Sequence, residues 1–261
     1  MAAREISRKR HRSFASRLPT MLAVDFRRMF TMPMFYIMSG IAVVIPVLIL
    51  VMTTAVSGSG ESSMTFTSAW QMIGSLSTDS SAMMDMTSMC NINLLYFMAA
   101  VLVCCFVAGD FQSGYAKNLF TVRSRRDEYA ISKMIVCFFA SALLIPLFFV
   151  GTVLGAAIAG LPFTMVGFHI GNLVMCLLAK ILLMGVFVSI YVVASVAARQ
   201  RLWLSIIIAL MVGMFLFMII PMMTPLDATV LHVILCLAGS ALFSVGLSAA
   251  STAILRKASV A

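Results

Sequence analysis

Charged side chains are scarce in this sequence, and acidic ones are the scarcest. Only 10% of its 261 residues are charged, with nine Asp or Glu against 18 Lys or Arg, while 62% are apolar. Soluble domains carry about 25% charged and about 45–50% apolar residues. The composition therefore excludes an ordinary soluble domain and predicts an integral membrane protein.

Residues for phosphate binding and catalysis are also missing. The sequence contains no GxxxxGK[ST] loop, so we do not expect this chain to hydrolyse ATP by that route. Its histidines, His11, His169 and His232, have no second His or carboxylate at metal-binding or catalytic spacing. The six cysteines follow no paired pattern and are interpreted as small apolar fillers. We therefore expect no active site and no cofactor bound by this chain.

Long apolar runs are what the sequence does contain. Six stretches approach the roughly 20 residues that an α-helix needs to cross the hydrocarbon core. They are Phe35–Val56, Asn93–Gly109, Ile135–Leu154, Leu177–Ala197, Leu202–Ile220 and Val230–Ala250. The fold class expected is all-α, with a six-span transmembrane domain over residues 34–257 and a short tail at 258–261.

Small residues and prolines predict how these spans pack. Four-residue spacings of small side chains favour close helix contact. They occur at Gly151 and Gly155, and at Ser240, Ser244 and Ser248. Pro46 and Pro146 are expected to kink spans one and three.

The basic residues are sorted between alternate connections, and this sorting predicts the orientation. Eight Lys or Arg precede the first span, and five lie between spans two and three. The connections 57–92, 159–176 and 221–229 contain none. By the positive-inside rule both termini are cytoplasmic. The net charge of +9 is thereby explained by topology and by attraction to anionic lipid, and we expect no nucleic acid partner.

Residues 1–33 are interpreted as a basic cytoplasmic tail followed by an amphipathic helix in the membrane interface. Apolar residues from Leu18 to Phe30 share one helical face, and Arg27 and Arg28 are expected on the opposite, polar face. Asp25 is the one misfit on the apolar edge, and Pro33 is expected to end the helix. The alternative is a simple basic flank with chance periodicity.

The external segment, residues 57–92, is rich in methionine. Its dense thioether and thiol cluster consists of Met83, Met84, Met86, Met89 and Cys90. Soft sulfur ligands at such spacing can hold Cu(I). The chain has 23 methionines, however, so composition alone also explains a local run. Metal binding is therefore kept only as an alternative.

Lys180 is the one ionisable residue expected inside a span, about one turn into span four. Intramembrane charge often marks a substrate or ion site. The interpretation favoured here is structural, with the long stem carrying the ammonium outward to the interface. Scarce intramembrane charge argues against proton- or sodium-driven transport.

One charged segment, residues 110–133, lies between spans two and three. It reads DFQSGYAKNLFTVRSRRDEYAISK and holds eight of the 27 charged residues. Phe111 and Tyr115 are expected to anchor a short helix, and Gly114 to let backbones approach closely. Arg125 and Arg126 could pair with carboxylates of a partner. The alternative is that the cations merely enforce topology, which leaves the interleaved aromatic and acidic residues unexplained.

The six spans, the interfacial helix and the basic connection together resemble the type-2 ABC exporter permeases. That family commonly has an acidic residue leaving span two, a glycine four residues later, a Ser/Arg turn, and a lysine entering span three. The matching positions here are Asp110, Gly114, Arg125, Arg126, Tyr129 and Lys133.

The resemblance implies that the connection contains a coupling helix that docks on a separate ATPase. The expected coupling residues are Asp110, Phe111, Gly114, Tyr115, Lys117, Arg125, Arg126 and Asp127. It also implies two ATPase subunits carrying ATP and Mg²⁺, a second permease copy or sister permease, and a bacterial cytoplasmic membrane.

Family members near this size often export antimicrobial peptides or small hydrophobic toxins, so we expect an amphipathic or hydrophobic substrate. The connection 221–229 is too short for the sizeable re-entrant element of lipid and polysaccharide carriers. The alternative function is an ATPase-independent channel or secondary transporter.

Overall fold

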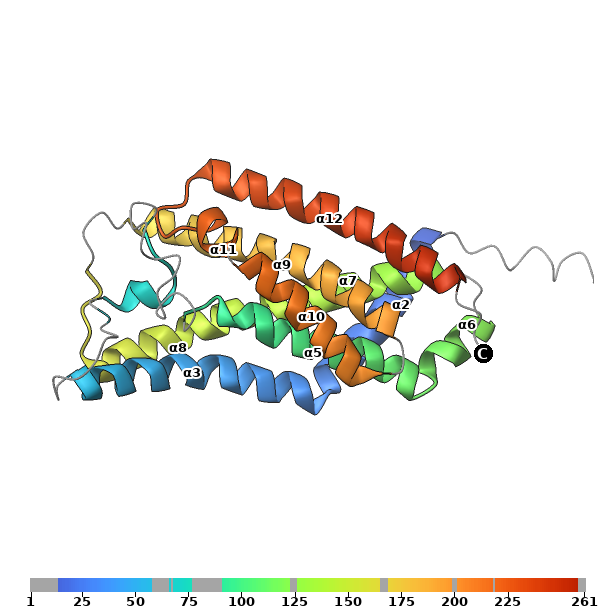
Figure 1. Cartoon of the computed structure of the whole chain (residues 1–261), viewed down its shortest axis with the longest axis horizontal. Helices are drawn as coiled ribbons and strands as arrows, with labels where there is room; N and C mark the ends of the chain where they lie inside the picture. Colours follow the sequence, from blue (N-terminus) through green and yellow to red (C-terminus); the bar gives the residue numbers. More distant parts are fainter. Residues whose placement is uncertain are drawn as a thin grey trace, which may run out of the picture.

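The computed structural model describes residues 14–57, 66, 68–76, 91–122, 126–164, 169–198, 201–217 and 219–257. Over these residues the chain is an elongated bundle of helices without a strand (Figure 1). The elements are α2 (Phe14–Thr31), α3 (Pro33–Ser57), the 3₁₀ helix η1 (Ala69–Met72), α5 (Leu94–Gln112), α6 (Tyr115–Val122), α7 (Arg126–Ala142), α8 (Leu144–Ala159), α9 (Ile170–Ala198), α10 (Leu202–Phe217), α11 (Ile219–Met223) and α12 (Val230–Lys257). The all-α expectation is confirmed.

Among the described residues, five helical segments are long and apolar enough to cross a membrane. They are α3, α5, α9, α12, and the pair α7–α8, which reads as one segment over Asp127–Ala159. The predicted span over Leu202–Ile220 corresponds to α10, which is apolar but 16 residues long, followed by the five-residue α11. The count of six spans therefore stays a prediction. Five of the six predicted spans have the length that a membrane crossing needs.

Successive long segments run in alternating directions along the bundle (Figure 1). One end, which we name the α2 end, holds α2, α6, the start of α10 and the last turn of α12. The opposite end, the η1 end, holds η1, the start of α9, and α11. The start of α2 and the end of α12 thus lie at the same end of the molecule.

The positions where α3 and α8 begin agree with the prolines in the sequence. α2 ends at Thr31, and Pro33 is the first residue of α3, a position where proline's missing N–H is tolerated. α7 ends at Ala142 and α8 begins at Leu144, so the helix is interrupted at Leu143, three residues before Pro146. Pro46 lies within α3, whose helix continues from Pro33 to Ser57 without a break.

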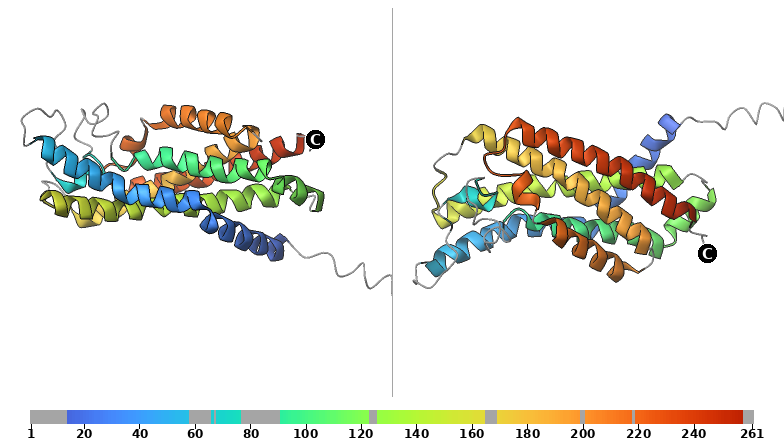
Figure 2. Two further views of the ribbon diagram at one scale, coloured as in Figure 1. Left: turned by 90° about the horizontal axis from the view of Figure 1, so that it is seen from below. Right: turned by 45° about the horizontal axis from the view of Figure 1, so that its top comes forward.

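The small residues predicted to bring helices together do so. A Cβ on Gly155 would lie 2.8 Å from Val47 Cα of α3, and one on Gly151 would overlap Val43 O. Bare glycines therefore let α3 and α8 pack backbone to backbone along their length (Figure 2).

The serines of α12 serve the same purpose against α9, which lies beside it along most of its length (Figure 2). Gly185 of α9 faces the side chain of Ser240, and Ser189 Oγ lies 3.0 Å from Ser244 Oγ. Ser248 is different, because its hydroxyl donates to Val245 O within its own helix. Two of the three spaced serines thus face α9.

Candidate functional site

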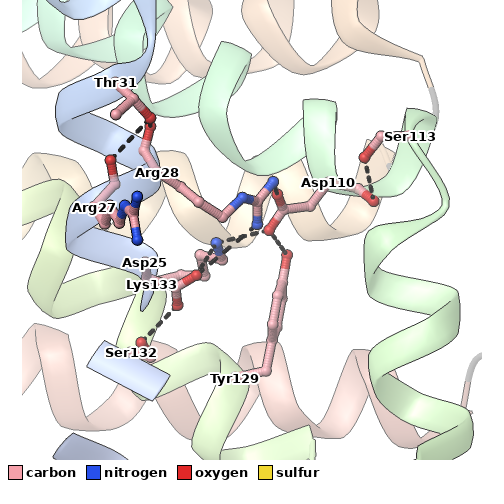
Figure 3. Close-up of polar contacts among 9 residues, drawn as sticks. All are labelled: Asp25, Arg27, Arg28, Thr31, Asp110, Ser113, Tyr129, Ser132 and Lys133. Carbon is pink, nitrogen blue, oxygen red and sulfur yellow. Dashed lines mark hydrogen bonds and ion pairs between the residues drawn. The ribbon is translucent and has the colours of Figure 1, made fainter. Parts of the chain in front are cut away.

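Four charged side chains meet inside the bundle at the α2 end. They are Asp25 and Arg28 from α2, Asp110 from α5, and Lys133 from α7, and we name them the charge cluster (Figure 3). Asp25, Asp110 and Lys133 have fully buried side chains, and the Arg28 side chain is 34% exposed. With two carboxylates and two cations the cluster is formally neutral, which is the condition under which buried charges are tolerated.

Lys133 lies at the centre of the charge cluster. Its Nζ is 2.8 Å from Asp25 Oδ1 and 2.7 Å from Asp110 Oδ2. Asp110 also accepts a hydrogen bond of 2.7 Å from Arg28 Nη2. Short charge-assisted bonds of this kind have a defined geometry, so they fix the position of α2 relative to α5 and α7.

Two hydroxyl groups of α7 add further hydrogen bonds to the carboxylates. Tyr129 Oη donates to Asp110 Oδ2 at 3.1 Å, and Ser132 Oγ donates to Asp25 Oδ2 at 2.6 Å. Tyr129, Ser132 and Lys133 are close together in sequence, so one turn of α7 bonds both carboxylates.

Aromatic rings cover the two cations and bring α6 into the same arrangement. The Arg28 guanidinium carbon lies 3.9 Å from the ring centroid of Tyr115, the first residue of α6. Lys133 Nζ lies 4.0 Å from the ring centroid of Phe106. Burial, the largest single influence, lowers the pKa of Arg28, but the charge and hydrogen bond of Asp110, together with Tyr115 and Asp25, outweigh it and raise the pKa above its ordinary value. The guanidinium therefore stays charged.

The local sequence of α2 explains why its charges point inward. Met21, Asp25 and Met29 are four residues apart, so they share one face, and all three are buried. The amphipathic helix predicted from residue 18 is present, but Asp25 belongs to its buried face. The prediction that Arg28 lies on the polar face is wrong, because its side chain turns inward to Asp110.

The turn between α5 and α6 depends on Gly114. Its φ is +72°, in the left-handed region where only glycine is unstrained. A Cβ there would meet nothing within 4 Å, so the predicted close backbone approach is wrong. Gly114 instead reverses the chain after α5 and places Tyr115 beside Arg28.

The other predicted coupling residues divide into inward-facing and outward-facing groups. Phe111 packs inward, its ring 6.2 Å from that of Tyr129, whereas Lys117 is exposed. Asp127 is partly exposed and pairs with Arg256 of α12 at 3.1 Å. Arg125 lies outside the described residues, and Arg126 begins α7 without a described side chain. The structure thus joins Asp110, Phe111 and Tyr115, but leaves Lys117 and Asp127 apart from them.

Lys180 does not behave as expected. Its side chain is 1% exposed, and α9 begins at Ile170, which places it nearly three turns inside the helix. The interpretation that its stem carries the ammonium outward is therefore wrong. Nζ instead donates to Asn93 Oδ1 at 3.0 Å and to Thr224 Oγ1 at 2.9 Å.

The methionine cluster predicted as an alternative metal site, residues 83–90, lies outside the described residues. In the described part of the chain, no three His, Cys, Asp or Glu side chains gather in a way that could hold a metal ion.

Sequence reasoning missed Asp25 and Arg28 as members of this site. The signal for Asp25 was present, because an acid on the apolar face of a helix implies a buried cation nearby. Its partner Lys133 is 108 residues away, and Asp110 is 82 residues from Arg28, so local periodicity could not identify them.

Comparison with known proteins places the chain in a family. A family model described as "ABC-2 family transporter protein" matches residues 31–216, well over half of the chain, from the end of α2 to α10. No curated protein and no solved structure matches it. Asp110 and Lys133 lie inside the matched region, whereas Asp25 and Arg28 precede it. The chain therefore belongs to the ABC-2 transporter family and is a multi-pass membrane permease of an ABC transporter.

Proposed function

We propose that this permease exports an amphipathic or hydrophobic molecule, such as an antimicrobial peptide or toxin, across a bacterial cytoplasmic membrane. Two separate ATPase subunits bind and hydrolyse MgATP, and a second copy or a sister permease completes the pathway. The family membership and the absence of a phosphate-binding loop from the sequence support this division of labour.

In this proposal the α2 end faces the cytoplasm. The basic residues whose side chains are described as exposed all lie at this end, in α2, in α6, before α10 and in the last turn of α12: Arg27, Lys117, Arg201 and Arg256. The connections at the η1 end contain no Lys or Arg. The positive-inside rule therefore supports a cytoplasmic α2 end, where soluble ATPases would dock.

The charge cluster is the observation that carries the proposed mechanism. The ATPase docks on the connection between α5 and α7, through α6 and the residues Arg125 and Arg126. Because Asp110 is buried, it does not contact the ATPase; it joins α5 to α2 and α7. A push on α6 reaches α2 through the Tyr115–Arg28 contact and reaches the spans through Asp110 and Lys133.

A rigid link is needed for such a push to travel. Buried, hydrogen-bonded ion pairs hold one geometry, since any displacement exposes charges to an apolar surrounding. All four carboxylate oxygens in the cluster have a partner among Arg28, Tyr129, Ser132 and Lys133. α2, α5 and α7 are therefore expected to move together.

The alternative function is an ATPase-independent channel or secondary transporter, and buried Lys180 is the observation that favours it. Purification of the tagged permease in a mild nonionic detergent distinguishes this alternative from the exporter proposal. The exporter proposal expects a soluble ATPase of about domain size to be retained. Loss of that companion under every gentle condition, with ion-driven transport intact, would favour the alternative.

The docking surface is tested by replacing Arg125 and Arg126 together by glutamate. This variant should insert in the membrane normally but lose ATPase binding or transport. A matched control replaces Arg199 and Arg201 by glutamate, which changes the net charge equally on the α9–α10 connection. Equal loss in both variants would show a general charge effect and contradict docking at the α5–α7 connection.

A further inference from the structure

Lys180 is held differently from Lys133, the other fully buried lysine among the described residues. Its two hydrogen-bond partners, Asn93 Oδ1 and Thr224 Oγ1, are neutral oxygens. In the described residues no carboxylate forms an ion pair with it. An ammonium has three N–H donors, so one of them has no partner among these residues.

Fold stability alone does not explain a cation at this position. Burying an ammonium without a counter-charge is costly, even after the surroundings relax. Neutral Asn93 and Thr224 do not need a charge to satisfy them, and Thr224 already donates to Ile220 O at 2.8 Å. A positive charge is therefore not required to satisfy these side chains.

The position of Lys180 indicates access from the η1 end. Its partners come from two distant parts of the chain, Asn93 just before α5 and Thr224 just after α11. Beside them, Ile92 N donates to Met72 O at 3.0 Å and Leu226 N donates to Ser75 O at 2.8 Å. Residues 68–76, which we name the η1 cap, are thus tied to both segments that hold Lys180.

The η1 cap is held by hydrogen bonds to loop backbone and by apolar packing, since Ala69, Met72 and Ile73 are fully buried and Trp70 stacks on Phe149. Besides the two bonds above, Ala69 N and Trp70 Nε1 donate to carbonyls of Pro162 and Phe163. No charged pair in the described residues holds it. Because the cap is bonded to Ile92 and Leu226, which are close in sequence to Asn93 and Thr224, displacement of the cap is the route by which a ligand would reach the ammonium.

We propose that Lys180 is a specificity-determining residue that binds a carboxylate of the transported molecule after the η1 cap opens. This inference rests on the proposed function, since a substrate site presupposes transport. One ammonium neutralises one negative charge, which suits a carboxylate on an amphipathic molecule. The Thr224 hydroxyl and the Asn93 amide can donate as well as accept, so both can turn toward the carboxylate oxygens.

The test uses the full-length permease alone in nonionic detergent, so its outcome does not depend on an ATPase. The chain has two tryptophans, Trp70 in the η1 cap and Trp203 at the opposite end. A W203F background therefore leaves Trp70 as the sole fluorescent reporter of the cap. The probes are N-dodecanoylglycine, which carries a carboxylate, and its neutral glycinamide analogue.

We expect the carboxylate probe to shift Trp70 emission and to bind about tenfold more tightly than the amide, as a charge-assisted bond implies. Lys180→Met should abolish this preference, and Lys180→Arg should keep most of it. Lys117→Met, at an exposed lysine of the α2 end, is the control and should leave it unchanged. Equal binding of both probes by the unaltered permease, or a preference that survives in Lys180→Met, would overturn the proposal.

Discussion

Lys133 and Lys180 are both buried in the helical bundle, at opposite ends, but their surroundings differ in charge. Lys133 is bonded to two carboxylates, at 2.7 and 2.8 Å, inside a neutral cluster of four charges. Lys180 is bonded to an amide oxygen and a hydroxyl. A compensated charge can serve to hold helices together, whereas an uncompensated one is kept in spite of its cost. The difference indicates a structural and coupling role for Lys133 and a binding role for Lys180.

The largest expected effect is that of Lys133→Met. It leaves Asp25 and Asp110 buried with only Arg28 to balance them, and removing one partner of a buried ion pair costs about 3–5 kcal/mol. Thermal unfolding of the purified permease in detergent should show a large drop in melting temperature. Lys117→Met is the control for losing an exposed lysine nearby. Equal melting temperatures for the two variants would contradict a structural role for Lys133.

A smaller effect is expected for Asp110→Asn, which keeps the shape but removes the charge that faces Arg28 and Lys133. Loss of hydrogen bonds to charged partners should lower the free energy of unfolding by about 2 kcal/mol. In the Asp110→Asn background, Arg28→Met should lower the free energy of unfolding by less than it does in the unaltered protein. The double-mutant cycle should give a coupling energy of about 0.5–3 kcal/mol. Strict additivity would mean that Arg28 and Asp110 do not interact.

Lys180→Met sharpens the comparison because it should not destabilise the fold as Lys133→Met does. It removes two hydrogen bonds but also an uncompensated buried charge, so the free energy of unfolding should change by about 1 kcal/mol or less, in either direction. The same thermal unfolding experiment measures it. A loss as large as that of Lys133→Met would show that Lys180 is structural and would oppose its role in substrate recognition.

The smallest effect is expected for Arg256→Gln, which breaks the pair with Asp127. The two side chains are 67% and 44% exposed, and exposed ion pairs contribute about 0–1 kcal/mol. The melting temperature of the variant should therefore be close to that of the unaltered permease, and added salt should not change the difference between them. A drop comparable to that of Asp110→Asn would show that the pair joining α7 to α12 stabilises the fold as much as the charge cluster does.

Local sequence patterns predicted what depends on local interactions. Apolar runs located the long helices, the period of α2 predicted an amphipathic helix, and Gly151 and Gly155 predicted the contact of α8 with α3. The start of α9 was placed seven residues late, at Leu177 instead of Ile170, because that stretch mixes apolar residues with Gly171 and Asn172. Boundaries of this kind depend on what the helix packs against.

The charges were harder to predict, because their partners are far away in sequence. Lys180 lies 87 residues from Asn93 and 44 from Thr224. An amide and a hydroxyl are common neutral groups, so nothing in the sequence identifies these two as the partners of a buried cation. Arg28 has Arg27 beside it, so one of two adjacent arginines turns inward while the other is exposed. Only the packing of α2 on α7 decides which one does.

The central claim is that the charge cluster transmits the motion of the ATPase to the spans. The most direct test measures ATP hydrolysis and transport in the same proteoliposomes for Arg28→Met/Asp110→Asn, which removes one charge of each sign and keeps the Lys133–Asp25 pair. The account predicts that the ATPase stays bound and hydrolyses ATP while the transport per ATP hydrolysed falls sharply. Transport per ATP equal to that of the unaltered complex would contradict it.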